Sequence, residues 1–234
     1  MIGPWLRFFR VVNLPTVPGD VLAGAAMMCF GSELTSRRVV AIATAAVASV
    51  FLYMFGLADN DIVGIKTDTG RPIPNGEISP HAARIARTAC LAAAVAFGLV
   101  ARLQIDWWFT VALLTLWILL YNRTKICALM GLCRGFNVLA GVTVVGCCGV
   151  SAALASLVMP AIWTLYIGWV TWYSTGEELD PRKRRFVGFL IGAIVYLQLI
   201  ALLIFRVDPL LLTGAGLLVV LRLMKRFLPE VSAS

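Results

Sequence analysis

The sequence predicts an all-α, polytopic membrane protein. Hydrophobic residues make up 60% of the 234 residues and charged residues only 14%, with a mean hydropathy of +0.89. A soluble domain carries about 25% charged residues. The apolar residues also form long runs, whereas strands of a membrane barrel would alternate polar and apolar residues. Because a backbone in lipid must satisfy its own hydrogen bonds, runs of this length are expected to be helices.

At roughly 20 apolar residues per crossing, the chain fits about eight transmembrane helices in a single domain, residues 1–234. The expected spans lie near residues 14–32, 39–58, 85–102, 107–121, 132–150, 155–173, 186–205 and 209–224. In the first span, Pro15, Pro18 and Asp20 interrupt the apolar run, which is typical of a helix that lines a cavity. Without that helix, seven spans remain.

The basic residues predict the orientation of these spans. One side of the membrane, which holds both termini and the loops after spans 2, 4 and 6, carries fifteen of the 20 Lys and Arg residues. The other side carries four, and Arg134 falls inside the fifth span. By the positive-inside rule, both termini are predicted to be cytoplasmic and the protein to lie in the cytoplasmic (inner) membrane. The net charge of +8 follows from this placement, so no nucleic-acid partner is expected.

The polar segment after the second span carries the clearest chemical signal. It contains Asp59, Asn60, Asp61 and Asp68 next to the end of an apolar helix. On a helix with about 100° per residue, Asn60, Asp61 and Asp68 would share an arc of roughly 100°. One or two carboxylates beside phosphate oxygens are how Mg²⁺ is usually held. The alternative is a solvated polar loop.

Several motifs resemble signatures of the UbiA superfamily of intramembrane prenyltransferases. In that family, Asn-Asp-x-x-Asp-x-x-x-Asp is followed by Arg-Pro-x-Pro-Ser-Gly-x-Ile-Ser. The similar motifs here are Asn60-Asp61-x-x-Gly64-x-x-x-Asp68, Arg71-Pro72-Ile73-Pro74-Asn75-Gly76-Glu77-Ile78-Ser79, Arg7-x-x-Arg10-Val11-x-Asn13-Leu14, Tyr121-Asn122-x-x-Lys125 and Arg134-Gly135-x-Asn137. The resemblance runs from about residue 5 to residue 205.

The chain also departs from the family pattern. Gly64 stands where the family has its middle aspartate, and only two residues separate Asp68 from Arg71. The family's second Asp-rich signature belongs after span 6, where Glu177, Glu178 and Asp180 are not at its i, i+4 spacing. Nine spans are usual in the family.

The resemblance implies a helical bundle around a central cavity that transfers a prenyl group from a prenyl diphosphate to an acceptor within the membrane. Mg²⁺ is the implied cofactor, acting as a Lewis acid on the leaving diphosphate. The resemblance implies three sets of site residues. The implied metal ligands are Asn60, Asp61, Asp68, Glu177, Glu178 and Asp180. The implied catalytic residues are Asp61, Asp68 and Lys125, and the implied substrate-binding residues are Asn13, Arg71, Tyr121, Arg134 and Asn137. Because four crossings separate the two acidic stretches, both are expected on one side of the membrane.

Some of these residues have a structural explanation as well. Lys125 follows an apolar span and is explained equally well as a positive-inside anchor. An Arg inside a span costs about 2.5–3.5 kcal/mol and usually faces a cavity or a partner, which favours a functional role for Arg134. Asn13 and Asp20 either line the cavity or only cap and break the first helix. The run 182–185 is explained most simply as a cytoplasmic anchor or as a contact with anionic lipid.

Two other functions compete with prenyl transfer. CDP-alcohol phosphotransferases also hold Mg²⁺ in a membrane bundle, but their Asp-Gly-x-x-Ala-Arg motif is absent from this sequence. A non-catalytic prenyl-lipid-binding or transport protein on the same fold is favoured by Gly64 and by the weak second acidic stretch. The acceptor, the prenyl length and the oligomeric state are not predicted by the sequence.

Overall fold

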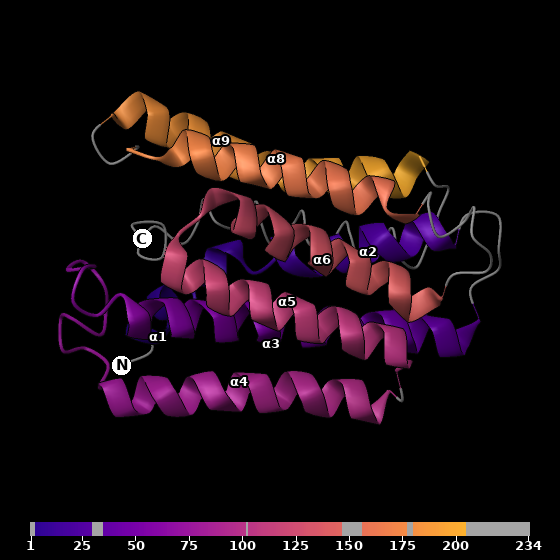
Figure 1. Ribbon diagram of the computed structural model, residues 1–234, viewed down its shortest axis with the longest axis horizontal. Helices are drawn as coiled ribbons and strands as arrows, with labels where there is room; N and C mark the ends of the chain where they lie inside the picture. The colour runs from indigo at the N-terminus through magenta and orange to yellow at the C-terminus, as the bar shows by residue number, and fades with distance from the viewer. Residues whose placement is uncertain (1–2, 30–34, 102, 147–155, 177–179, 205–234) are drawn as a thin grey trace.

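The computed structural model describes residues 3–29, 35–101, 103–146, 156–176 and 180–204, and all regular structure within them is helical. The elements are α1 (Gly3–Phe8), the 3-10 helix η1 (Val11–Asn13), α2 (Thr16–Met28), α3 (Ser36–Val63), α4 (Pro80–Val100), α5 (Ile105–Thr124), α6 (Cys127–Val145), α8 (Val158–Ser174) and α9 (Pro181–Ile204). Figure 1 shows the long helices side by side along one direction. The prediction of an all-α membrane bundle is confirmed.

Seven of the eight predicted spans coincide with helices. Among the described residues, α3, α4, α5, α6 and α9 are long and apolar enough to cross a membrane. The helices α2 and α8, with 13 and 17 residues, occupy the first and sixth predicted spans. The eighth predicted span, 209–224, lies outside the described residues.

The end of α3 differs from the prediction. The helix continues through Val63, where the Gly64 N–H bonds to the Asn60 carbonyl at 2.9 Å. Asp59, Asn60 and Asp61 therefore belong to its last turns and not to a loop. The helix tolerates these polar residues at its end because each of their side chains is paired, as described below.

The helix α6 lies at the centre and contacts α2, α3, α5 and α8. Its contact with α2 is close: a Cβ added at Gly141 would lie 2.0 Å from the Val21 carbonyl oxygen, and one at Gly24 would lie 2.0 Å from that of Val138. Small residues that let backbones approach are typical of helix pairs in membranes. This contact positions the polar residues of α2 against those of α6.

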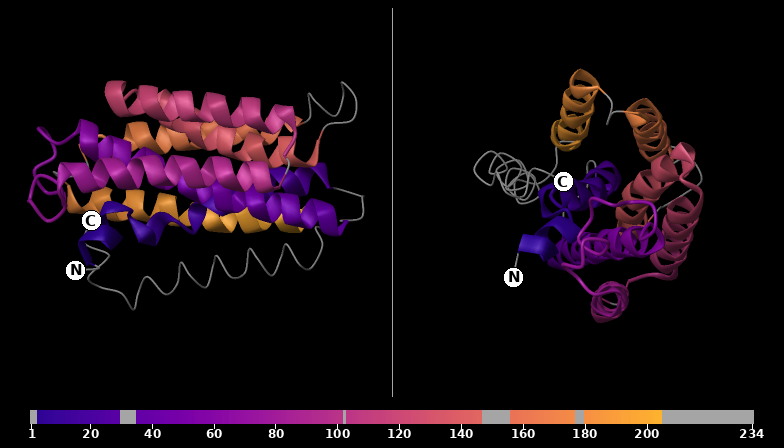
Figure 2. Two further views of the ribbon diagram at one scale, coloured as in Figure 1. Left: turned by 90° about the horizontal axis from the view of Figure 1, so that it is seen from below. Right: turned by 90° about the vertical axis from the view of Figure 1, so that its left-hand side faces the viewer.

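One end of the bundle gathers the polar connections. The loop 64–79, α1, the last turn of α8 and the first turn of α9 all lie at the left end in Figure 1. Seen along the bundle in Figure 2, α4 lies at one edge beside α3, and α8 and α9 lie at the opposite edge. Asp180, the described residue of the second acidic stretch, thus lies at the same end of the bundle as the first acidic stretch.

Candidate substrate cavity

A cavity of about 280 Å³ lies between α3, α5 and α6. Its middle is apolar, with Leu52, Leu114 and Ile118 among its lining residues. Both ends are polar. Ser49 and Asn60 line opposite ends on α3, and their separation by eleven positions corresponds to about 16 Å along the helix axis. We call the first end the floor (Ser49, Arg134, Asn137) and the second the mouth (Arg10, Asn60, Asp68, Arg71, Lys125).

The arginines of the mouth share one buried carboxylate. Asp61 is 2% exposed, and Arg71 donates a hydrogen bond to it. Arg10 Nη2 lies 3.6 Å from Asp61 Oδ1, and Arg71 Nη2 lies 2.9 Å from Asp68 Oδ2. Asp68 lines the cavity, whereas Asp61 lies behind the two arginines. The two carboxylates therefore balance only part of the positive charge at the mouth.

Lys125 closes the other side of the mouth. Its Nζ donates a hydrogen bond to Asn60 Oδ1 and lies 5.6 Å from the centroid of the Tyr121 ring. Partial burial, followed by the positive charge of Arg71, lowers the pKa of Lys125 from its ordinary value of 10.5. Lys125 thus faces the cavity instead of serving only as an anchor outside the bundle.

Two cations of the mouth have an unusual backbone. Arg10 has φ 43° and Lys125 has φ 57°, and among the described residues only these two non-glycine residues have positive φ. A left-handed conformation is unfavourable for residues with a Cβ, and such residues cluster at functional sites. Both line the cavity.

Gly64 provides space for the Asp68 carboxylate. A Cβ added at Gly64 would lie 2.6 Å from Asp68 Oδ2 and 3.1 Å from Asp68 Cγ. The Asp68 N–H bonds to the Gly64 carbonyl at 2.9 Å, so the chain turns back on the end of α3. Asp68 thus lies where a side chain at position 64 would begin.

The floor is built around Asp20 of α2, which is 0% exposed. Arg134 Nε lies 3.0 Å from Asp20 Oδ2, and Asn137 Nδ2 donates to the same oxygen at 3.0 Å. Trp163 Nε1 and Gln198 Nε2 donate to Asp20 Oδ1 at 3.0 and 2.6 Å. One carboxylate thereby joins α2, α6, α8 and α9.

Further hydrogen bonds extend this network to the cavity side. Ser49 Oγ donates to Asn137 Oδ1 at 2.6 Å, and Arg134 Nη2 donates to the Thr16 carbonyl at 3.0 Å. Arg134 and Asn137 are 8% and 5% exposed, and both line the cavity. Because Asp20 balances the charge of Arg134, the floor has little net charge.

A second buried carboxylate supports the mouth from behind. Asp59 is 0% exposed, and it accepts hydrogen bonds from Arg87 Nη1 and Asn122 Nδ2, each at 3.0 Å. Asn122 also donates to the Gly56 carbonyl at 3.0 Å and lines the cavity. These bonds connect the end of α3 to α4 and α5, which fixes the position of Asn60.

The structure places most of the predicted site residues around this cavity. The cavity-lining members of that set are Asn60, Asp68, Arg71, Tyr121, Lys125, Arg134 and Asn137. Asp61 lies behind the mouth. Asn13 lies in η1, where its carbonyl accepts a hydrogen bond from Thr16 Oγ1 at 2.8 Å. The structure puts Arg134 at the floor with Asp20, away from Arg71 and Lys125.

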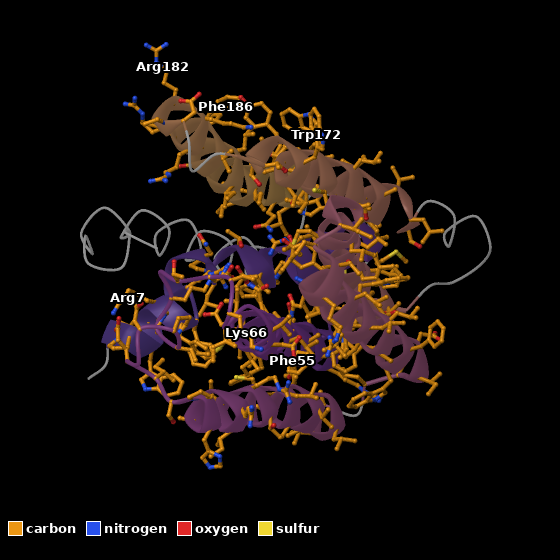
Figure 3. The ribbon with its side chains drawn as sticks, turned by 60° about the vertical axis from the view of Figure 1, so that its left-hand side comes forward. Arg7, Phe55, Lys66, Trp172, Arg182 and Phe186 are labelled. Atoms are coloured by element: carbon orange, nitrogen blue, oxygen red, sulfur yellow. The ribbon has the colours of Figure 1, made fainter. Side chains whose placement is uncertain are left out.

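The second acidic stretch is only partly described. Glu177 and Glu178 lie outside the described residues. Asp180 is exposed, accepts a hydrogen bond from the Arg182 N–H at 2.8 Å, and does not line the cavity. In Figure 3, Arg182 projects outward from the end of α9. The predicted role of this stretch in binding metal stays a prediction.

The mouth has the donor set that Mg²⁺ requires beside a diphosphate. Within the described part of the chain, no group of three or more His, Cys, Asp or Glu side chains lies together. Mg²⁺ at phosphate sites needs only one or two carboxylates, because substrate oxygens and waters complete its shell. Asp68 and Asn60 offer such oxygens at the cavity, so the residues present fit the ion.

Sequence reasoning did not assign a site role to several lining residues. Arg10, Ser49 and Asn122 line the cavity without having been assigned one. Ser49 lies in an apolar run and gives no local signal. The buried position of Asp20 could be anticipated, since an acid inside a span needs a partner, but the partners come from three distant helices.

No protein-family model and no curated protein sequence matches the chain. Among solved structures, a digeranylgeranylglyceryl phosphate synthase matches with a TM-score of 0.61 at 17% identity, covering 99% of this chain and 95% of that one. A UbiA homolog from Archaeoglobus fulgidus bound to DMAPP and Mg²⁺ matches with a TM-score of 0.58 at 14% identity, covering 96% and 86%. The same homolog bound to GPP and Mg²⁺ gives the same values.

Proposed function

We propose that this chain, which shares its fold with UbiA homologs, transfers a prenyl group from a prenyl diphosphate to an acceptor within the membrane. The observation that carries the proposal is a single cavity with a cationic mouth, oxygen ligands at that mouth and an apolar middle. A diphosphate needs cations and hydrogen-bond donors. A prenyl group needs an apolar wall that excludes water. The cavity offers both the cations and the apolar wall within a length of about 16 Å.

At the mouth, Arg71 and Lys125 would bind the diphosphate oxygens. Arg71 is the better suited to two oxygens at once, since its guanidinium presents donors in a fixed fork, while Lys125 acts as a point charge. Both would stabilise the negative charge that builds on the leaving group. Tyr121, whose ring lies 5.6 Å from Lys125 Nζ, would favour the charged ammonium by a cation–π contact.

Asp68 and Asn60 would hold Mg²⁺, with Asp61 and the acidic residues 177–180 as further predicted ligands. When bound, the ion would supply Lewis-acid stabilisation of the leaving diphosphate. Asn60 is held by Lys125, and the adjacent Asp59 is held by Arg87 and Asn122. These pairs would keep the ligand oxygens oriented without a large change in the helix.

The apolar middle would hold the isoprenoid group beside Leu114 and Ile118 of α5 and Leu52 of α3. Exclusion of water from this part of the cavity would let the acceptor, and not water, capture the allylic carbon. The acceptor remains to be identified. We place the mouth at the cytoplasmic face of the inner membrane on the basis of the positive-inside rule.

The alternative is a prenyl-lipid-binding or transport protein that keeps the cavity without turnover. Gly64 favours it, since the family's middle aspartate is absent. The two functions predict different fates for a bound prenyl diphosphate. An enzyme cleaves it in the presence of an acceptor, while a binding protein returns it unchanged.

The test is diphosphate release by the purified full-length protein in detergent. GPP and Mg²⁺ would be supplied with aromatic, glycerol phosphate and sugar acceptors in turn. We expect release with at least one acceptor, its loss on chelation of Mg²⁺, and a loss of at least about a hundredfold in Asp68→Ala. Asp106→Ala, which removes an exposed carboxylate at the opposite end of α5, is the matched control. Tight GPP binding without release would favour the non-catalytic alternative.

A further inference from the structure

We propose that Arg10, in the turn that follows the N-terminal helix α1, is a third phosphate-binding cation of the cavity and supplies its excess positive charge. The inference rests on the proposed function, because the ligand is the diphosphate of the substrate. Arg10 precedes the first membrane helix by six residues, and nothing in the spacing of the acidic segment points to it.

The protein's own charges at the mouth, apart from the proposed Mg²⁺, are positive in sum only when Arg10 is counted. Arg71 and Lys125 carry two positive charges, and Asp61 and Asp68 carry two negative charges close to them. Without Arg10, these four groups would be neutral in sum. Arg10 makes the mouth positive, which an incoming diphosphate needs.

The guanidinium of Arg10 is close enough to bind, and Asp61 is its one ion-pair partner in the described part of the chain. It lines the cavity, and its contact with Asp61 is 3.6 Å long, which exceeds the 2.7–3.2 Å of a hydrogen bond. The side chain is 31% exposed. Asp61 therefore balances part of its charge while leaving its hydrogen-bond donors available, and the stronger bond to Asp61 comes from Arg71.

The backbone of Arg10 directs the side chain to the mouth. Its φ of 43° and ψ of 51° end α1 and turn the chain toward η1. The turn is closed by hydrogen bonds from the Arg10 N–H to the Arg7 carbonyl at 3.0 Å and from the Asn13 N–H to the Arg10 carbonyl at 2.8 Å. Glycine adopts this left-handed conformation freely because it has no Cβ. Arginine has a Cβ, so its presence at position 10 has a conformational cost.

The position of α1 is fixed by the loop that carries Asp68 and Arg71. Phe8 is 0% exposed and packs in a cluster that includes Ile73 and Ile78 of this loop. Arg7 forms an ion pair with Glu77 of the same loop. Because α1 and the loop form one packed unit, Arg10 and Arg71 keep a fixed separation across Asp61.

A membrane anchor is the competing explanation for Arg10, since positive residues near a span commonly face lipid headgroups. An anchoring arginine would be replaceable by lysine, and its loss would not change affinity for a soluble anion. A phosphate-binding arginine depends on its fork of donors and is only partly replaced by lysine.

The experiment measures the affinity of the full-length protein in detergent for GPP with Mg²⁺ by calorimetry. We expect Arg10→Gln to weaken binding roughly tenfold to a hundredfold, as the loss of charge-assisted hydrogen bonds implies. Arg10→Lys should recover only part of that loss. The matched control is Lys66→Gln, which removes the same charge from an exposed residue of the loop that does not line the cavity, and it should stay within about twofold of the unmodified protein.

A second variant separates binding from folding. Arg10→Gly removes the side chain and relieves the positive φ, so it should unfold at the same or a higher temperature while losing as much affinity as Arg10→Gln. Wild-type affinity in both Arg10→Gln and Arg10→Gly would overturn the inference while leaving the proposed function intact. Absence of GPP binding in the unmodified protein would overturn both.

Discussion

The mouth and the floor of the cavity are both polar, but they are built in opposite ways. At the floor, Asp20 is fully buried and accepts from three side chains besides its ion pair with Arg134. At the mouth, Arg71 and Asp68 keep 27% and 30% of their side-chain surfaces exposed. At the floor the charges of Asp20 and Arg134 balance each other, whereas the cations of the mouth outnumber its carboxylates.

This difference separates what holds the bundle together from what would bind a ligand. A buried charge pair is costly to break, because the remaining partner is left without compensation in a region of low dielectric. A partly exposed pair contributes little to stability, since water solvates whichever partner remains. We therefore expect substitutions at the floor to change folding and substitutions at the mouth to change binding.

The largest expected effect is that of Asp20→Ala on stability. It leaves the Arg134 guanidinium and the donors of Asn137, Trp163 and Gln198 without their acceptor, and should lower the free energy of unfolding by about 3–5 kcal/mol. Denaturation of the detergent-solubilised protein would measure it. The comparison is Asp68→Ala, for which we expect a loss of less than about 1 kcal/mol.

The double substitution Asp20→Ala with Arg134→Met tests the reason for that effect. Removing the orphaned charge should restore part of the lost stability, because an apolar pair often replaces a buried ion pair without cost. If the double variant were no more stable than Asp20→Ala alone, the charge pair would not be the cause.

A smaller effect is expected where α2 and α6 are in close contact. Gly141→Ala would place a Cβ 2.0 Å from the Val21 carbonyl oxygen, and the backbones would have to separate. Overpacking of this kind typically costs about 1–3 kcal/mol, and it should also loosen the floor without reducing the charge of the mouth. Gly188→Ala on α9, where an added Cβ meets nothing within 4 Å, is the control. Equal stability of the two variants would contradict the close contact.

The smallest effect concerns pH. Since the pKa of Lys125 is lowered from 10.5, chiefly by burial, its charge is lost at a lower pH than that of an exposed lysine. GPP affinity should therefore fall as the pH rises through this lowered value. Stability should change in the other direction, because the unfolded chain binds more protons between the two pKa values. Lys125→Arg, titrated in parallel, should keep its affinity over this range; an identical profile would exclude Lys125 as the source.

The fold could be predicted from the sequence because lipid leaves few options. Long apolar runs must be helical, and seven of the eight expected spans fall on helices. The polar end of α3 was wrongly assigned to a loop, because the pairing of Asp59 with Arg87 and Asn122 depends on tertiary contacts. The local sequence favours a turn at residues 59–61, but these tertiary contacts stabilise the helix through Val63.

The site could be predicted only where residues lie in one stretch or in a resembling motif. Asn60, Asp68, Arg71 and Lys125 do line the cavity. The floor could not be predicted, since Asp20 joins partners more than a hundred residues away along the chain. Arg10 does belong to a motif that resembles the family's, but its place at the mouth depends on the left-handed conformation that it adopts between α1 and η1, which no periodicity reveals.

The absence of a side chain at Gly64 has a meaning beyond a lost ligand. The Asp68 carboxylate occupies the space that a side chain at position 64 would need, with 2.6 Å between Oδ2 and an added Cβ. An aspartate at position 64 would therefore displace the Asp68 carboxylate from its present place at the cavity. The acidic character of this corner depends on the space left for one carboxylate and not on the number of aspartates in the segment.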